Sequence, residues 1–150
     1  MKIAEELSKI STLFIDTAPI IYYIEAHSIY GPITKEIVIS FQSEQREAFS
    51  TVLTLTEVLP KPMKIGDEKL AGKFADFLKY GRNFSLIEIS EKIAERAGRL
   101  RSRYTELRTV DAVQLAAAIE NGIEIFITND KKLKKVNEIK VVVLDDYVKI

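Results

Sequence analysis

The sequence contains no cysteine and a single histidine, His27, among its 150 residues. Without cysteine, the chain can form neither a disulfide framework nor a thiolate metal site. With one histidine, most zinc sites and every mechanism that needs a pair of histidines are excluded. Oxygen ligands are what remain for a metal ion, and these favour magnesium or manganese.

Long apolar stretches are also missing. No run of about 18 apolar residues is present that could span a membrane, and the N-terminal segment MKIAEELSKIS lacks the unbroken apolar core of a signal peptide. We therefore expect a cytoplasmic protein that does not bind a membrane. Its length of 150 residues, with 47% hydrophobic and 29% charged residues, predicts one globular domain over residues 1–150.

An excess of either charge is absent, because 22 basic and 22 acidic residues give a formal net charge of zero. The basic residues nevertheless form two blocks, one within residues 92–108 and one within residues 131–135. A block of this kind is most often a solvated helix face. Both blocks lie close in sequence to acidic residues that are candidates for a functional site, which favours contact with a polyanion.

Short apolar runs alternate with helical patterns along the chain. Strands are predicted at residues 12–16, 49–54, 84–88, 125–128 and 141–144, and helices at residues 18–26, 33–45, 67–80, 90–104 and 110–121. Repeated alternation favours an α/β fold with a parallel sheet that is covered on both faces. Right-handed crossovers place the carboxyl ends of all strands on one edge, where ligands bind in open α/β sheets.

Four acidic residues lie where the predicted elements begin or end. Asp16 ends the first strand, Asp130 follows the fourth strand, and Glu57 follows the second. Asp111 lies in the first turn of the last helix, for which Thr109 is the predicted N-cap. Because carboxylates repel one another, several of them at one sheet edge favour a bound cation. The spacing therefore predicts a divalent-metal site and, with it, phosphodiester chemistry.

Each of these acids also has an ordinary structural explanation. Asp111 can complement the helix dipole, Asp130 can cap a lysine-rich turn, and Asp16 can close a strand-to-helix turn. Glu57 can be a surface residue on a short helix. The hypothesis of a metal site depends on the conjunction of the four acids, three of which share one topological position.

Polar side chains beside the acids are suited to the same site. The hydroxyls of Thr17 and Thr128 can orient a carboxylate or a bound water, and Asn129 can do so or merely serve the turn. The pair Asp145 and Asp146 follows the last strand and is interpreted as a terminal turn, although it can approach the same edge. His27 is expected to be structural or superficial.

Four segments together resemble the motifs of PIN-domain nucleases. They are FIDTAPIIY at residues 14–22, TLTEV at 54–58, TVDAVQLAAA at 109–118 and TND at 128–130. Within that superfamily, the chain is most similar to the VapC-type toxins of toxin–antitoxin systems. The resemblance covers residues 12–147, and it is specific because the four motifs occur in the right order on the right elements.

This resemblance implies a Rossmann-like, three-layer α/β/α sandwich with a parallel sheet of about five strands. It also implies a magnesium- or manganese-dependent ribonuclease in which water attacks the RNA phosphodiester. Its catalytic and metal-binding residues are then Asp16, Glu57, Asp111 and Asp130, and Thr128 supports them. Residues 1–11 have no counterpart in a minimal domain of this family, and we predict a helix there that packs elsewhere.

Candidate partners follow from position and patterning. The residues predicted to contact RNA phosphates are Arg103, Arg108, Lys131 and Lys132. A set of apolar residues exceeds what one sheet face needs and indicates a surface for an antitoxin peptide or for a second copy in a homodimer. These residues are Ile21, Ile24, Ile37, Val38 and Phe41. Simple burial of this set explains the same pattern.

Two further functions are consistent with the sequence. The first is a non-catalytic regulatory module of the same fold that binds RNA or protein. The second is a phosphoryl-transfer domain of the receiver or phosphatase type. The second is disfavoured because no adjacent pair of acids follows the first predicted strand.

Overall fold

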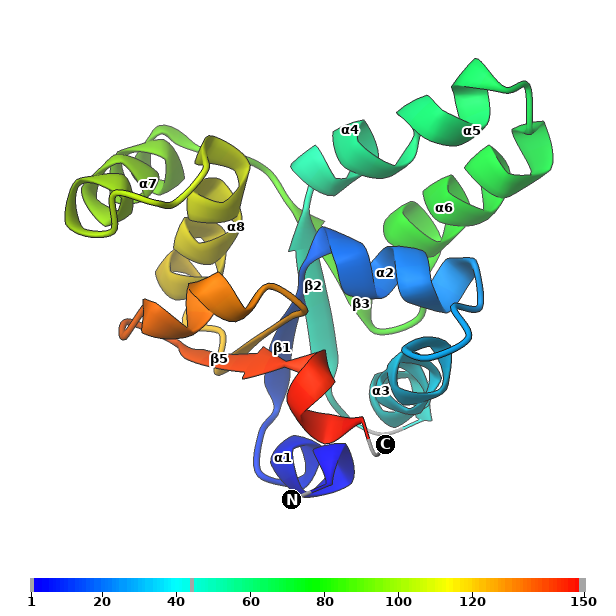
Figure 1. The fold of residues 1–150 in the computed structure, drawn as a ribbon, viewed down its shortest axis with the longest axis horizontal. Coiled ribbons are helices and arrows are strands. Elements are labelled where there is room, and N and C mark those ends of the chain that lie inside the picture. The colour runs from blue at the N-terminus through cyan, green and yellow to red at the C-terminus, as the bar shows by residue number, and fades with distance from the viewer. Residues whose placement is uncertain (1, 44, 149–150) are drawn as a thin grey trace.

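The computed structural model describes residues 2–43 and 45–148. At its centre lies a parallel sheet of five strands in the order β3-β2-β1-β4-β5 (Figure 1). The strands are β1 (Thr12–Ile15), β2 (Glu47–Thr51), β3 (Phe84–Ile87), β4 (Ile125–Thr128) and β5 (Lys140–Val143). The sheet and its parallel order confirm the predicted α/β fold.

Helices cover both faces of the sheet (Figure 1). One side carries α1 (Ile3–Ser8), α2 (Thr17–Ile24), α3 (Gly31–Ser43), α4 (Leu53–Val58), α5 (Pro60–Lys64) and α6 (Glu68–Tyr80). The other side carries α7 (Glu91–Arg103) and α8 (Thr109–Glu120). Two 3-10 turns, η1 (Lys131–Lys135) and η2 (Leu144–Tyr147), follow β4 and β5. Among the described residues, no helix combines the length and the apolar character that crossing a bilayer requires.

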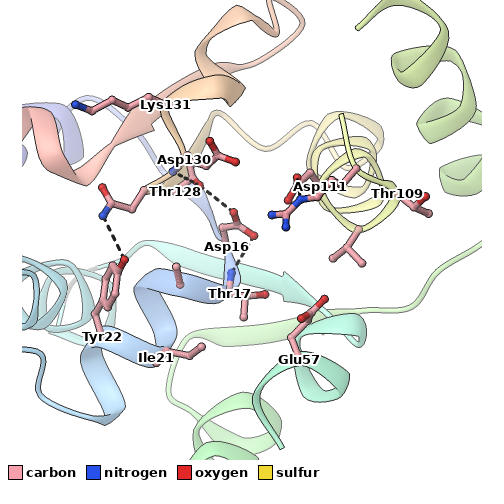
Figure 2. Close-up of a pocket in the computed structure, with 14 residues that line it drawn as sticks. Asp16, Thr17, Ile21, Tyr22, Glu57, Thr109, Asp111, Thr128, Asp130 and Lys131 are labelled. Atoms are coloured by element: carbon pink, nitrogen blue, oxygen red, sulfur yellow. Dashed lines mark hydrogen bonds and ion pairs between the residues drawn. The ribbon is translucent and has the colours of Figure 1, made fainter. Parts of the chain in front are cut away.

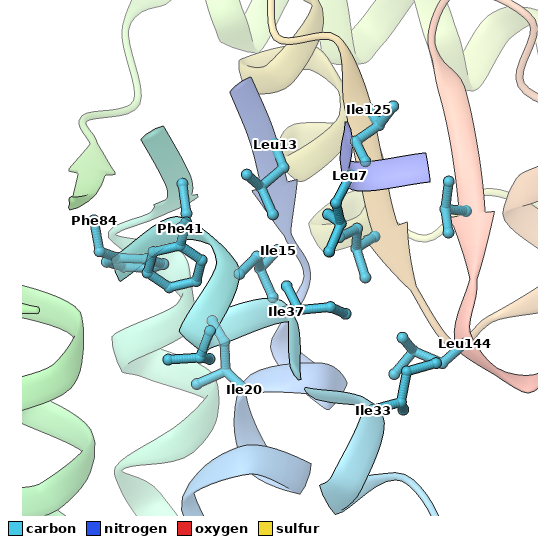
Figure 3. Packing of buried hydrophobic residues seen from close by; sticks show 14 of the residues in the cluster. Leu7, Leu13, Ile15, Ile20, Ile33, Ile37, Phe41, Phe84, Ile125 and Leu144 are labelled. Atoms are coloured by element: carbon cyan, nitrogen blue, oxygen red, sulfur yellow. The ribbon is translucent and has the colours of Figure 1, made fainter. Parts of the chain in front are cut away.

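The central strands are apolar on both faces because both faces are covered. Leu13 and Ile15 of β1 belong to the core under α1 to α6 (Figure 3), whereas Phe14 between them belongs to the core under α7 and α8. Phe14 stacks on Phe126 of β4, with ring centroids 5.0 Å apart and planes inclined by 7°. A continuous apolar run is therefore typical of such a strand, since its alternating side chains enter two different cores.

Helix α8 is buried along most of its length. All residues from Asp111 to Ala118 are buried, and four of them are alanines, which lets the helix approach the sheet closely. The predicted N-cap at Thr109 is wrong, because Arg108 holds that position with an extended backbone and no side-chain cap. Loop residue Leu107 anchors the connection from α7, since its carbonyl accepts from Arg101 Nε at 3.4 Å.

Several predicted boundaries differ from the structure, those of β2 and α3 among them. The predicted strand 49–54 ends at Thr51, because the hydroxyl of Thr51 accepts the Leu53 N–H at 3.2 Å and α4 begins there. The predicted helix 33–45 begins at Gly31 and ends at Ser43, and its residue 44 lies outside the described residues. The apolar pattern continues past Thr51, but the hydrogen bond between Leu53 and Thr51 turns the chain from β2 into α4.

The predicted apolar partner surface is wrong for three of its five members. Ile37, Val38 and Phe41 are only 2%, 3% and 0% exposed and belong to the core under α1 to α6. Ile21 and Ile24 are half-buried and pack against the same core. The excess of apolar residues reflects helices that are packed on two sides, by the sheet and by neighbouring helices.

The order of the strands creates a crevice beside β1. The chain runs from β1 outward to β2 and β3, and then returns to β4 on the opposite side of β1. The connections that leave β1 and β4 therefore diverge. In open α/β sheets, such a switch point at the carboxyl ends of the strands is where ligands bind.

The stacked pair at the sheet centre gives a stability prediction. Replacing Phe126 by alanine removes a fully buried ring and leaves a cavity beside Phe14, so we expect the free energy of unfolding to fall by about 3–5 kcal/mol. Urea denaturation monitored by circular dichroism measures this change. Ile65→Ala, at a side chain that is 70% exposed, is the control and should change stability by less than about 0.5 kcal/mol. Equal losses in both variants would contradict the assignment of the core.

Candidate active site

A pocket of about 550 Å³ opens at the carboxyl ends of β1 and β4, at the switch point of the sheet (Figure 2). It contains all four acids that the sequence singled out. The residues that line it are Asp16, Thr17, Ala18, Ile21, Tyr22, Glu57, Arg108, Thr109, Val110, Asp111, Thr128, Asn129, Asp130 and Lys131.

Asp16 occupies the centre of this edge, between β1 and α2. It is the N-cap residue of α2, and its Oδ1 accepts the backbone N–H of Thr17 at 2.9 Å. Its Oδ2 accepts the hydroxyl of Thr128 at 2.9 Å. The side chain is buried, and this burial raises the pKa of Asp16 to about 6, against the effect of the two hydrogen bonds. Asp111 and Asp130 raise it further through charge repulsion.

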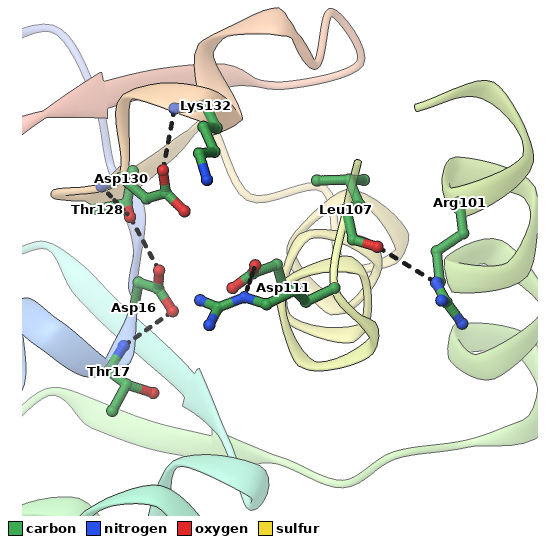
Figure 4. A network of polar contacts seen from close by, with 9 residues as sticks. Asp16, Thr17, Arg101, Leu107, Asp111, Thr128, Asp130 and Lys132 are labelled. Carbon is green, nitrogen blue, oxygen red and sulfur yellow. Dashed lines mark hydrogen bonds and ion pairs between the residues drawn. The ribbon is translucent and has the colours of Figure 1, made fainter. Parts of the chain in front are cut away.

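Asp130 is linked to Asp16 through one threonine (Figure 4). The N–H of Asp130 donates to Thr128 Oγ1 at 3.1 Å, while the Thr128 hydroxyl donates onward to Asp16. Asp130 also caps η1 by accepting the N–H of Lys132 at 3.0 Å. Asp130 therefore caps η1 and at the same time lines the pocket, so its role as a cap does not remove it from this edge of the sheet.

Asp111 enters the pocket from the first turn of α8 and is paired with a cation. Arg108 Nε lies 3.1 Å from Asp111 Oδ2, in an ion pair whose arginine side chain is 80% exposed. This ion pair raises the pKa of Arg108, with smaller contributions from Asp130 and Asp16. Arg108 is thus the local counter-ion of three aspartates, although it is held by only one of them.

Glu57 completes the set from the opposite wall. It lies on α4, across the pocket from Asp111 (Figure 2). Its side chain is exposed, and within the described part of the chain it has no hydrogen bond and no ion pair. Its position is consequently fixed only through the helix that carries it.

The side chains of two predicted supporting residues, Thr17 and Asn129, do not contact the acids as expected. Among the described residues, the Thr17 hydroxyl is the one buried side-chain polar atom that has no hydrogen-bond partner. Asn129 donates from Nδ2 to the Tyr22 hydroxyl at 3.3 Å and accepts the N–H of Asp145 at 3.1 Å. Asn129 therefore orders the rim of the pocket instead of orienting one of the four acids.

The predicted RNA contacts fall into two groups. Arg108 and Lys131 line the pocket, and Lys132 lines an adjoining hollow of about 200 Å³ that shares Arg108, Asp111 and Asp130 with it. Arg103 lines neither of them and instead lies 3.2 Å from Glu138.

The sequence indicated a terminal turn at Asp145 that can also approach the same edge. Asp145 does lie in η2, but it accepts the Tyr30 hydroxyl at 2.7 Å and pairs with Lys131 Nζ at 3.1 Å. These two contacts lower the pKa of Asp145. The available signal was its place after β5, since the carboxyl ends of all parallel strands share one edge.

The donor set of the pocket fits a hard divalent cation. Carboxylate and hydroxyl oxygens are the ligands that magnesium and manganese prefer. The raised pKa of Asp16 and the partnerless hydroxyl of Thr17 both indicate that an added cation or water would be stabilised here. Within residues 2–43 and 45–148, however, no three acidic or histidine side chains are grouped as a metal site. Instead, Arg108 forms an ion pair with Asp111 and neutralises part of the negative charge in the pocket.

The buried charge of Asp16 predicts how stability depends on pH. Its pKa of about 6 lies above the ordinary value of 3.8, so between these pH values Asp16 keeps in the native state a proton that it loses in the unfolded state, and the contribution of Asp16 to stability falls as the pH rises through them. Asp16→Asn has no charge to bury. In metal-free buffer, its stability relative to the wild type should therefore be about 2 kcal/mol more favourable at pH 7 than at pH 4. Urea denaturation at both pH values tests this, and a difference independent of pH would contradict it.

Comparisons with known proteins agree with this geometry. The sequence model described as the PIN domain matches residues 13–139, which is most of the chain. No protein of curated function matches the sequence.

Solved structures with the same fold include three from toxin–antitoxin systems. DNA-bound VapBC from Salmonella typhimurium has a TM-score of 0.73 and 16% identity, with 89% of this chain and 98% of that chain covered. VapC20 from Mycobacterium tuberculosis, described as a toxin that cleaves the sarcin–ricin loop, has a TM-score of 0.66 and 17% identity over 85% and 98%. A toxin–antitoxin complex from Klebsiella pneumoniae has a TM-score of 0.64 and 26% identity over 88% and 97%. With a family match over most of its length and its acids at one edge of the sheet, the chain belongs to the PIN domain family.

Proposed function

We propose that this protein is a divalent-metal-dependent endoribonuclease, a hydrolase of phosphodiester bonds, and the toxin of a toxin–antitoxin pair. One observation carries the proposal: four carboxylates from β1, α4, α8 and the turn after β4 line a single pocket at the switch point. Membership of the PIN domain family supports nuclease chemistry at that pocket.

The residues that would hold magnesium or manganese are Asp16, Glu57, Asp111 and Asp130. When bound, the ion would stabilise the negative charge of the phosphate oxygens and lower the pKa of a bound water molecule to near neutrality. Thr128 orients one oxygen of Asp16, and the N–H of Thr17 fixes the other. Water attacks phosphorus, the bond to the 3′ oxygen breaks and that oxygen takes up a proton, so hydrolysis leaves a 3′-hydroxyl and a 5′-phosphate.

Cations of the chain bind and orient the phosphate backbone. Arg108 is 80% exposed on its side chain, so it can exchange Asp111 for a phosphate and make the bidentate contact that guanidinium favours. Lys131 lies at the opposite rim, where Asp145 holds it. Since the net charge of the protein is zero, these contacts are local and RNA affinity should fall as salt rises.

The assignment as a toxin rests on likeness to proteins that are described as toxins or as toxin–antitoxin complexes. The partner proposed for this chain is accordingly an antitoxin protein, and RNA is the proposed substrate. A homodimer is a further proposal, to be tested by gel filtration with and without the product of any adjacent small gene. Such a ribonuclease would act in the cytoplasm.

One observation favours a second candidate, a non-catalytic module that binds RNA or protein. Asp111 is already paired with Arg108, and the described residues contain no grouped metal site. In a non-catalytic module, the acids would orient helices and neighbouring cations, and the protein would act by binding RNA or protein without cleaving RNA. Growth inhibition by a doubly substituted Asp16→Asn, Asp111→Asn protein at the wild-type level would favour this candidate.

Loss of a single carboxylate provides the direct test of the nuclease. Asp16→Asn or Asp111→Asn should reduce manganese-dependent cleavage of RNA by about 100-fold or more, because each removes a charged ligand worth several kcal/mol. Gel analysis of labelled RNA measures cleavage, and circular dichroism verifies folding. Asp76→Asn, at an exposed position outside the pocket, is the matched control. Cleavage that persists in EDTA would contradict the metal mechanism.

The Arg108–Asp111 ion pair predicts opposite effects on metal and RNA. Arg108→Gln removes a cation that competes for Asp111, so manganese affinity, measured by electron paramagnetic resonance, should rise about 2- to 5-fold. The KM for RNA should increase, because a phosphate contact is lost. Arg99→Gln, which removes an exposed arginine that pairs with Glu95, is the control. Weaker manganese binding by the Arg108 variant would contradict this competition.

A further inference from the structure

A buried polar network connects the two helices that carry Glu57 and Asp111. Its members are Ser50 and Thr51 at the end of β2, Thr54 on α4 and Gln114 on α8, and each of the four is 0% exposed. Four fully buried polar side chains in contact are costly unless their hydrogen bonds are made. Such a group in a small core therefore requires an explanation.

The hydrogen bonds of the network are satisfied between elements. Gln114 Nε2 donates to Thr54 Oγ1 at 2.9 Å, and the Thr51 hydroxyl donates to Gln114 Oε1. The hydroxyls of Ser50 and Thr54 are 2.7 Å apart and share a hydrogen bond. Gln114 thus binds both β2 and α4 with the two ends of one amide.

This amide lies one helical turn away from each acid. Gln114 follows Asp111 by three residues on α8, and Thr54 precedes Glu57 by three residues on α4. Residues three apart share a side of a helix. The Gln114–Thr54 hydrogen bond consequently joins α8 and α4 about one helical turn from Asp111 and Glu57, which lie on opposite walls of the pocket (Figure 2).

The other acids do not need such a bridge. Asp16 and the Thr128–Asp130 turn end adjacent paired strands and are joined through the Thr128 hydroxyl. Glu57, in contrast, makes no hydrogen bond or ion pair of its own among the described residues. An apolar side chain at position 114 would contact α4 without fixing its orientation. Hydrogen bonds depend on direction, so bonds to both ends of the Gln114 amide fix the orientation of α4 relative to α8.

We propose that Gln114 and Thr54 are positioning residues that set the separation of Glu57 from Asp111. This inference rests on the proposed function for its catalytic consequence, namely a divalent-cation site that needs both carboxylates at a defined distance. Neither residue touches substrate. They act through the helices α4 and α8.

Manganese binding tests this role with closely matched variants. Thr54→Val keeps the shape of the side chain but removes the hydroxyl, and should weaken manganese affinity about 10-fold or more, as measured by electron paramagnetic resonance. Thr54→Ser restores the hydroxyl and should recover most of the affinity. Thr34→Val, which removes another buried threonine hydroxyl bonded 2.9 Å from the Gly31 carbonyl, is the control. An equal loss of affinity in Thr34→Val would overturn the proposal.

A double-mutant cycle identifies the acid through which Thr54 acts. In a Glu57→Gln background, Thr54→Val should change manganese affinity by less than about 2-fold, because the group that it positions is already altered. A full 10-fold loss in that background would overturn the proposal. If Thr54→Val fails to fold, Ser50→Ala replaces it, and a smaller loss that Glu57→Gln also suppresses is expected.

A second measurement does not depend on metal binding. Because the chain has no cysteine, spin labels can be placed at Lys61→Cys on α5, directly after α4, and at Arg99→Cys on α7, which packs on α8. The distance distribution should broaden or shift in Thr54→Val and return in Thr54→Ser. An unchanged distance distribution in Thr54→Val would contradict the proposal that the Gln114–Thr54 hydrogen bond sets the position of α4 relative to α8. If the wild type binds no manganese, the proposed function fails while this distance still decides the role of Gln114 and Thr54.

Discussion

The pocket is arranged around one carboxylate, that of Asp16, in a place where burial disfavours its charge. Asp16 ends the central strand, it is buried, and burial with two nearby aspartates raises its pKa to about 6. Two hydrogen bonds, from the Thr17 N–H and the Thr128 hydroxyl, hold it there. The fold tolerates this cost at the edge of its sheet, which is the arrangement expected where a cation or a proton is to be handled.

The two cores determine where this carboxylate lies. Leu13 and Ile15 anchor β1 to one core and Phe14 anchors it to the other, so the strand cannot shift by one residue without reversing its faces. Asp16 follows directly, and β4 pairs beside it in a register that sets Phe126 against Phe14. The packing of β1 in the two cores thereby fixes the position of the Asp16 backbone, and with it the place of the carboxylate.

The remaining acids reach the pocket by other means. Asp130 is held by a turn that it caps itself, Asp111 by a buried helix and its ion pair with Arg108, and Glu57 by a helix joined to α8 through a buried amide. The same side chains therefore have ordinary structural roles and line the pocket. A capping or dipole explanation for an acid, taken alone, does not argue against its place in a site.

The sequence by itself determined the α/β alternation, the parallel sheet and the four acids that line the pocket, because short apolar runs, helical periodicity and the ends of strands are local signals. It misplaced the end of β2 at residue 54 and the cap at Thr109, and for Ile37, Val38 and Phe41 it left a partner surface and simple burial open, of which the structure shows burial. Only the tertiary structure decided that Arg108 neutralises Asp111, that Asp145 holds Lys131, and that Gln114 meets Thr54. Those contacts join residues from separate elements or depend on one rotamer, and no periodicity in the sequence records which side chains meet when helices pack against a sheet.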